Sequence, residues 1–186
     1  MHIICRVNND FEGTTEPQIE SAIINGANSI IIPMVEDAKQ IIRAISAIQG
    51  RAKLIIMIES QAGVENLEAL VKCKFDAIYV GLNDLSISRG GSSLFEPLSD
   101  GTVKRIIATS KVPVGVGGVT DPSLGELVKS EYIIKKYAEL GVKFSVLRRS
   151  FEQAITKNSP DIVISNIKKC YVDYRKETVN LRSEVI

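Results

Sequence analysis

The chain has few of the residues on which several common chemistries depend. Its 186 residues include one histidine, three cysteines and no tryptophan. The single histidine, His2, excludes a metal site built from several histidines and leaves no internal histidine for a Ser-His-Asp triad. Cys5, Cys73 and Cys170 form no CxxC pair, so the sequence indicates neither a zinc site nor a disulfide framework, and we expect reduced thiols. Any metal would be held by oxygen ligands, which favours Mg²⁺ or Mn²⁺.

Long apolar runs and an excess of charge of one sign are also missing. The net charge is +1, with 24% charged and 45% hydrophobic residues. No basic patch interleaved with aromatic residues points to nucleic acid, and the apolar runs are too short to span a bilayer. Residues 1–7 do not have the pattern of a signal peptide, so we expect a cytoplasmic protein. The length predicts one domain, over residues 1–176, followed by a polar, frayed tail over 177–186.

Short apolar segments alternate with helical patterns along the chain. A strand–helix–strand order makes successive strands parallel, and continuous apolar runs fit strands that are covered on both faces. The fold class is therefore α/β, of the TIM (β/α)₈ barrel type. A complete barrel has eight strands and about 250 residues, so we expect an incomplete barrel of about six βα units. The predicted strands are 3–7, 29–35, 53–58, 76–81, 113–119 and 143–147. The predicted helices are 17–25, 38–49, 63–72, 103–111, 130–140 and 151–176, the last broken near Pro160, and a loop is predicted over 86–99.

Acidic residues end two successive predicted strands. Glu59 follows strand 53–58, and Asp84 follows strand 76–81. In parallel α/β folds ligands collect at the carboxyl ends of strands, and adjacent strands lie about 4.8 Å apart. Two carboxylates at that spacing can share one divalent cation. The alternative is that both acids are only turn residues or helix N-caps.

Several segments together resemble the HpcH/HpaI aldolase/citrate lyase family. This family comprises metal-dependent, pyruvate-handling TIM barrels that include 4-hydroxy-2-oxoheptanedioate aldolase and the citrate lyase β subunit. The segments with the most specific resemblance are IMIESQAGVENLEAL and FDAIYVGLNDLSISRG, which contain the two acids. The other matching segments are ICRVNND, NGANSIIIPMVEDAKQ and, more weakly, YAELGVKFSVLRRSF.

The resemblance implies a carbon–carbon lyase that acts on a 2-oxo acid through a divalent-metal-bound pyruvate enolate. It implies that Glu59 and Asp84 bind the metal and that Arg6 contacts the substrate and stabilises the enolate oxygen. The backbone amides of Asn83 and Asp84 would hold the substrate carboxylate. The alternatives are an ion pair at the barrel rim for Arg6, a helix cap for Asn83 and Asp84, and an ordinary surface position for Arg149. The substrate-binding residues implied in this way are Arg6, Gly81, Asn83 and Asp84. Arg149, at the end of the last predicted strand, is placed to meet a carboxylate or phosphate of the substrate.

The sequence also departs from the family pattern. In family members two further βα units precede the segment that matches residues 4–10, and they carry a histidine proposed as general acid/base; His2 does not match it. Met57 stands where the aldolase branch often has glutamine. Two alternatives therefore remain: a CoA-thioester lyase of the citrate lyase β type, or a non-catalytic barrel remnant that acts as an interaction or regulatory subunit. As in the family, we expect a homo-oligomer whose partner is a small 2-oxo acid.

Overall fold

The computed structural model describes residues 1–91, 93–125 and 128–183, with side chains through residue 176. The chain divides into two compact units, Met1–Gly115 and Val116–Ile186, and each is described by itself. The prediction of a single domain over 1–176 stays a prediction.

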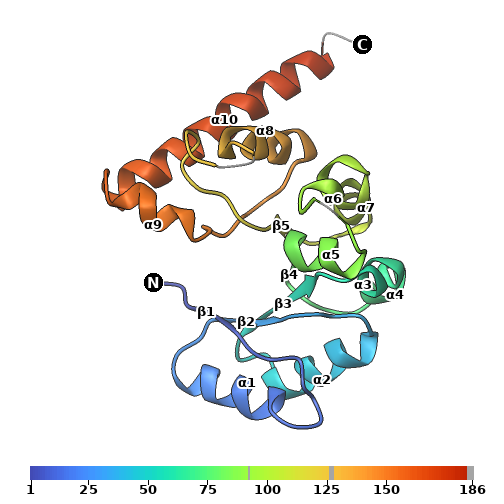
Figure 1. The fold of residues 1–186 in the computed structure, drawn as a ribbon. Helices are drawn as coiled ribbons and strands as arrows, with labels where there is room; N and C mark the ends of the chain where they lie inside the picture. The colour runs from blue at the N-terminus through green and yellow to red at the C-terminus, as the bar shows by residue number, and fades with distance from the viewer. Residues whose placement is uncertain (92, 126–127, 184–186) are drawn as a thin grey trace. The chain divides into compact units, whose positions relative to one another are not determined.

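The first unit is built around a parallel sheet with helices between its strands (Figure 1). The strands follow one another in chain order, and β1 to β4 pair in parallel, so the predicted α/β class is correct. The strands are β1 (Ile4–Arg6), β2 (Ser29–Ile32), β3 (Lys53–Ile58), β4 (Ala77–Val80) and β5 (Val114–Val116), the last of which contains the boundary between the units. The helices are α1 (Thr15–Ile24), α2 (Ala38–Ile48), α3 (Gln61–Glu65), α4 (Leu67–Leu70), α5 (Leu82–Ser88), α6 (Glu96–Ser99) and α7 (Thr102–Thr109).

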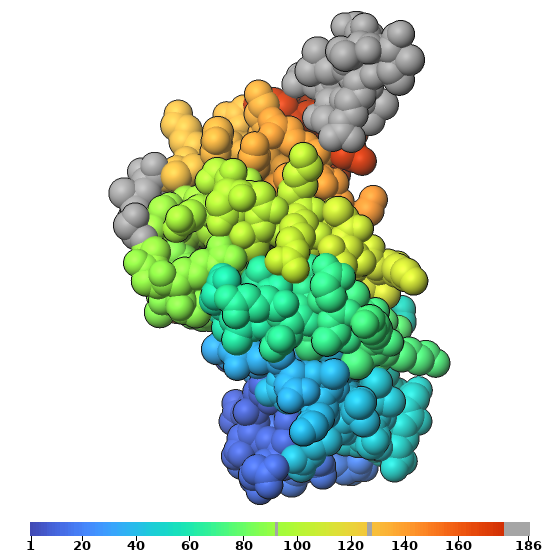
Figure 2. Space-filling view, turned by 90° about the vertical axis from the view of Figure 1, so that its right-hand side faces the viewer, coloured from blue at the N-terminus to red at the C-terminus, as the bar shows by residue number. Residues whose placement is uncertain are grey.

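The strand register separates two faces of this sheet. The outer face carries fully buried aliphatic side chains, including Ile56, Ile58 and Ile78, each with 0% exposure. Figure 2 shows the residues of the first unit, coloured from blue to yellow-green, as closely packed side chains on the side turned to the viewer. The opposite face, called the inner face below, is set by the pairing of β1 to β4. Its rows are Arg6–Ile31–Ile55–Ala77 and Met57–Tyr79, and these rows lead to Glu59 and Gly81.

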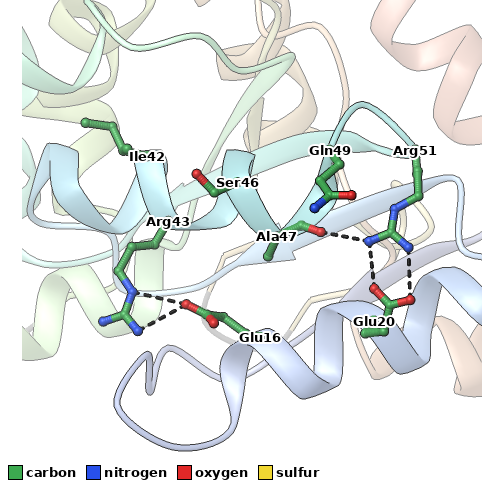
Figure 3. A pocket seen from close by; sticks show the side chains of 8 residues that line it. All are labelled: Glu16, Glu20, Ile42, Arg43, Ser46, Ala47, Gln49 and Arg51. Atoms are coloured by element: carbon green, nitrogen blue, oxygen red, sulfur yellow. Dashed lines mark hydrogen bonds and ion pairs between the residues drawn. The ribbon is translucent and has the colours of Figure 1, made fainter.

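Helices α1 and α2 are joined by ion pairs across a shallow hollow (Figure 3). Arg51 on one side reaches Glu20 at 2.6 Å, and Arg43 reaches Glu16 at 3.1 Å. Helix α2 is well specified by its sequence, because Asp37 and Gln40 form a capping box at its start. Each exposed ion pair contributes at most about 1 kcal/mol. We therefore assign the packing energy of this pair of helices to the apolar face of α2.

The second unit consists of helices that pack around two short bridging segments. Helix α10 (Pro160–Ser183) packs along α8 (Ser130–Leu140), and α9 (Ser150–Ile155) precedes it. Val119 and Leu147 form an isolated parallel bridge. The Tyr171 hydroxyl donates to the Val142 carbonyl at 2.8 Å and so ties α10 to the segment after α8. No helix in the described ranges is long and apolar enough to cross a membrane.

Three predictions about individual elements were wrong. Within residues 143–147 only positions 144 and 147 form bridges and no sixth strand forms, so the described sheet has five strands. The predicted loop over 86–99 contains the end of α5 and all of α6, while its position 92 lies outside the described residues. The tail predicted to be frayed is helical as far as Ser183, where α10 ends, and residues 184–186 lie outside the described residues.

The terminal position of β1 in this sheet generates the first testable prediction. An edge strand offers unpaired backbone groups to another chain, and Ile4 on β1 is 53% exposed. We therefore expect the chain to associate in light scattering or sedimentation. Ile4→Lys should lower the associated fraction, because charge on an edge opposes strand addition. The matched control is Ile24→Lys, at a position that is 74% exposed on α1. Equal association of both variants would contradict a role for the β1 edge.

Candidate functional site

The candidate site forms around Glu59, which directly follows β3. Its side chain lies on the inner face but is only 2% exposed, which is unusual for a carboxylate. Its neighbour Ser60 caps α3 by accepting a hydrogen bond from the Gly63 amide at 3.1 Å. The chain therefore turns from strand into helix immediately after Glu59. This turn fixes the backbone position from which the Glu59 side chain extends.

A backbone amide from the neighbouring strand end holds one oxygen of this carboxylate. The Met34 amide donates to Glu59 Oε1 at 2.9 Å. Met34 has φ of 49°, in the left-handed region that residues other than glycine rarely adopt. The Asn9 side chain donates to the Met34 carbonyl at 2.8 Å and so supports this conformation from the other side. A strained turn after β2 thus supplies the backbone amide that binds the carboxylate at the end of β3.

The other oxygen of Glu59 depends on a glycine. A Cβ placed on Gly81 would lie 2.5 Å from Glu59 Oε2 and 2.8 Å from Glu59 Cβ, closer than real contacts allow. Gly81 is also the N-cap of α5, so this helix starts directly beside the carboxylate. Asp84 lies in its first turn, close enough for its charge to act on Glu59. The structure therefore brings the two predicted acids together.

Burial raises the pKa of Glu59 above its ordinary value of 4.5, and the charge of Asp84 raises it further. The Met34 hydrogen bond and the positive charge of Arg6 act in the opposite direction. Arg6 lies on β1 and is exposed, yet it is close enough to stabilise the charged form of Glu59. The same environment raises the pKa of Tyr79 to about 12, first through burial and then through the charge of Glu59.

The remaining predicted residues have different settings. The amides of Asn83 and Asp84 lie in the first turn of α5, where the helix itself offers them no acceptor. The Gly81 amide donates to the Ile58 carbonyl at 3.1 Å, so this glycine contributes space rather than a donor to the site. Arg149 is an exposed residue of the second unit, before α9. Its predicted role stays a prediction.

The sequence did not point to two parts of the site. One is Met34, since methionine carries no signal for a left-handed backbone. The other is Arg89, which donates to Gln61 Oε1 at 2.6 Å and to Asp100 at 2.8 Å, and so ties α3 to α5 and α6. An arginine after a helix is too common for this role to be read from sequence. Glu36, in the turn between β2 and α2, accepts a hydrogen bond from the Asn66 side chain at its backbone carbonyl and precedes the capping box.

Comparison with known families agrees with this geometry. A sequence model of the family described as HpcH/HpaI aldolase/citrate lyase matches residues 1–112, which lie within the first unit and include the whole Glu59–Asp84 site. The chain belongs to the HpcH/HpaI aldolase/citrate lyase family. At the level of its superfamily it is a lyase.

Solved structures show that the fold extends beyond the matched residues. CitE from Mycobacterium tuberculosis, in complex with magnesium and acetate, has a TM-score of 0.68 at 16% identity and covers 95% of this chain and 73% of its own. RipC from Yersinia pestis has a TM-score of 0.66 at 15% identity, with coverage of 90% and 75%. The citrate lyase beta subunit of M. tuberculosis, complexed with oxaloacetate and magnesium, has a TM-score of 0.64 at 14% identity and covers 90% of this chain and 72% of its own. No match was found among the curated proteins.

The residues of this HpcH/HpaI chain fit a divalent cation of the Mg²⁺ type. Two neighbouring carboxylates repel each other when both are charged, and a cation bound between them removes that repulsion. Among the described residues no cluster of three or more His, Cys, Asp or Glu side chains could hold a metal by itself. Mg²⁺ is commonly bound by one or two carboxylates, with substrate oxygens and water completing the shell. Glu59 and Asp84 supply that number of carboxylates.

The close approach of Gly81 and Glu59 predicts the effect of a single methyl group. Gly81→Ala should displace the Glu59 side chain or shift the backbone, at a cost of about 1–3 kcal/mol in unfolding free energy, and should weaken metal binding. Urea unfolding and calorimetric titration with Mg²⁺ measure the two effects. The control is Gly26→Ala, where φ of 91° adds strain but no atom lies within 4 Å of the new Cβ. Loss of metal affinity in both variants would contradict a local effect on Glu59.

The raised pKa of Glu59 predicts how stability depends on pH. In the metal-free protein the folded state keeps a proton that the unfolded chain releases near pH 4.5, so stability falls as pH rises from there through the folded pKa. Glu59→Gln should remove this fall and be the more stable protein near neutral pH. Urea midpoints across this pH range, with a chelator present, measure it. Glu20→Gln serves as a control of opposite sign, because a hydrogen bond from Arg51 lowers the pKa of Glu20. A Glu59→Gln protein that is less stable than the parent near neutral pH would refute the assignment.

Proposed function

We propose that the chain is a carbon–carbon lyase that acts on a 2-oxo acid, with a divalent cation held by Glu59 and Asp84. The observation that carries this proposal is the meeting of the two carboxyl groups at the ends of β3 and β4, within the electrostatic reach of Arg6. Cleavage of a carbon–carbon bond next to a carbonyl leaves an enolate, so the site must stabilise a developing negative charge. When bound, Mg²⁺ or Mn²⁺ would supply Lewis-acid polarisation of the substrate oxygens.

The two acids have separate tasks in this proposal. The Met34 amide and the space at Gly81 orient the buried Glu59, so its carboxylate can bind a cation with little reorganisation. Asp84 is exposed on the first turn of α5, where its carboxylate also accepts the Asn83 side chain at 3.2 Å. One ligand is thus fixed by burial, and the other lies on the solvent side from which a substrate enters.

Arg6 and the start of α5 would bind the anionic parts of the substrate. A guanidinium beside the carboxylate pair adds fixed positive charge where the enolate oxygen develops its negative charge. The first-turn amides of Asn83 and Asp84 point away from the helix body and can donate to the substrate carboxylate. Both groups belong to the first unit, as do the two acids. The relatives that bind magnesium with oxaloacetate or acetate support this choice of ligand class.

Metal titration tests the first half of the proposal. Calorimetry with Mg²⁺, with and without oxalate, should show binding to the parent protein that the Glu59→Gln/Asp84→Asn double variant has lost. Glu12→Gln/Glu16→Gln is the matched control, because it removes two carboxylates that pair with Arg43 away from the site. Equal metal binding by the parent and the Glu59/Asp84 variant would refute these two residues as ligands.

Oxaloacetate decarboxylation tests the chemistry, because loss of CO₂ yields the enolate of pyruvate, which solvent can protonate. Aldol cleavage also needs a placed base, worth about 10²–10⁴-fold, and should be weak or absent. Arg6→Ala should lower the decarboxylation rate by about 10²-fold, as loss of one oxyanion donor does. Arg105→Ala, at a half-exposed position, should leave it unchanged. A rate no higher than that of free metal, in folded protein shown to bind metal, would reject the proposal.

A further inference from the structure

The second unit contains a cavity of about 520 Å³ that has no part in the proposed function. Its described lining comes from α8, from α10, from residues 142–147 and from Val119, all of which belong to this unit. Cavities that bind small molecules commonly have volumes of about 300–1,000 Å³. The cavity is therefore large enough to hold a small ligand within one compact unit of the chain.

The cavity has a buried apolar floor and an exposed apolar mouth. The floor includes Val119, Ile134 and Val142, which are 5%, 1% and 3% exposed. The mouth includes Leu147 and Val172, which are 43% and 46% exposed. A ligand with an apolar chain would bury its own surface on the floor and would also cover the apolar side chains of the mouth. Both effects favour binding, because apolar surface is removed from water on each side.

The hydroxyl groups of the lining donate to backbone carbonyls. The Tyr171 hydroxyl donates to the Val142 carbonyl at 2.8 Å, and the Ser145 hydroxyl donates to the Val116 carbonyl at 2.7 Å. The Tyr137 hydroxyl likewise donates to a backbone carbonyl. These three groups therefore have acceptors within the protein, and an apolar chain in the cavity takes no hydrogen bond from them.

Two lysines add positive charge to the mouth. Lys143 follows α8 and Lys168 lies on α10, and both are exposed members of the lining. The described lining contains no acidic residue. Neither lysine forms an ion pair within the part of the chain that the structure describes. A carboxylate at the mouth would give these two ammonium groups an anionic partner.

The same charge decides between a small ligand and a second copy of the chain. In a dimer with two-fold symmetry the same surface patch contacts itself. Covering the cavity in this way would bring the Lys143 and Lys168 side chains of both copies together, and like charges across an interface oppose association. A small anion with an apolar chain matches both the charge of the mouth and the apolar floor.

We propose that this cavity binds a small amphipathic carboxylate, with its apolar chain on the floor and its carboxylate between Lys143 and Lys168. The ligand class is that of free carboxylic acids with an apolar chain. The lining includes none of the residues to which the proposed function assigns a role, so this inference does not depend on that function.

Calorimetric titration without Mg²⁺ tests the ligand class, with decanoate below its micelle concentration as the probe. The parent should bind decanoate in a saturable manner. Decanol should bind about tenfold more weakly or less, because it lacks the charge, and acetate should not bind measurably, because it lacks the chain. A parent protein without saturable decanoate binding would overturn the inference.

Lys143→Gln/Lys168→Gln tests the role of the charge. The double variant should bind decanoate about tenfold or more weakly and should bind decanol as the parent does. Lys157→Gln/Lys169→Gln is the matched control, because it removes the same charge from two exposed positions of the second unit outside the described lining. An equal loss of decanoate affinity in both double variants would mean that net charge alone drives binding, and would refute the site.

Val172→Trp tests the cavity itself, because a larger side chain at this exposed position narrows the mouth. It should weaken the binding of decanoate and decanol alike. The control is Val146→Trp, at a position that is 44% exposed and lies outside the described lining. Unchanged decanoate binding by folded Val172→Trp would overturn the inference. If this variant does not fold, the two lysine double variants decide.

Sedimentation of the same proteins tests the alternative occupant. The parent, Val172→Trp and Val146→Trp should have the same oligomeric state. A change of oligomeric state confined to Val172→Trp would show that a second copy covers the cavity, and would overturn the inference. None of these variants alters Glu59 or Asp84, so each should bind Mg²⁺ as the parent does, and the metal titration tests the proposed function separately.

Discussion

The buried carboxylate of Glu59 is the constraint around which the first unit is arranged. A carboxyl group that is 2% exposed resists ionisation, because burial removes the water that would stabilise its charge. Few groups of the protein replace that water. One oxygen has the Met34 amide, and the other lies in the space left by Gly81. The nearby charge of Asp84 opposes ionisation, and that of Arg6 assists it. Such a balance is unfavourable for a merely structural acid and fits the cation-binding role proposed for Glu59.

The backbone is irregular around this carboxylate. Met34 adopts a left-handed backbone, and the result is an amide aimed at Glu59. Gly63 lets α3 approach the Val35 carbonyl, where a Cβ would lie 2.7 Å from that oxygen. These features weaken the fold locally, while the outer face, with its fully buried Ile56 and Ile58, holds the strands in place. The stable face and the strained end of the same strands thus have different tasks, a division often found in α/β enzymes.

The sequence was most informative where periodicity or strand ends carry the signal. The first four strands, helix α2 and the meeting of Glu59 with Asp84 could be predicted, because parallel strands end at one edge. The break between α3 and α4 and the short α6 could not, because tertiary contacts such as the Arg89 network decide them. Residues 143–147 have the composition of a strand, yet only their bridging positions pair. An apolar composition favours burial, whereas strand formation also needs a neighbouring strand in register.

The edge of the sheet and the chemistry of the site are linked through one residue. Arg6 lies on β1, the terminal strand of the described sheet, and is exposed, whereas the acids it faces end the inner strands β3 and β4. An exposed arginine on an edge strand samples many rotamers, and its side chain must be restrained before its charge can act at a fixed position. Whatever polypeptide lies beside β1 therefore influences how well Arg6 is oriented. Glu59 is oriented by the interior of the first unit, whereas the orientation of Arg6 depends on what covers the edge of the sheet.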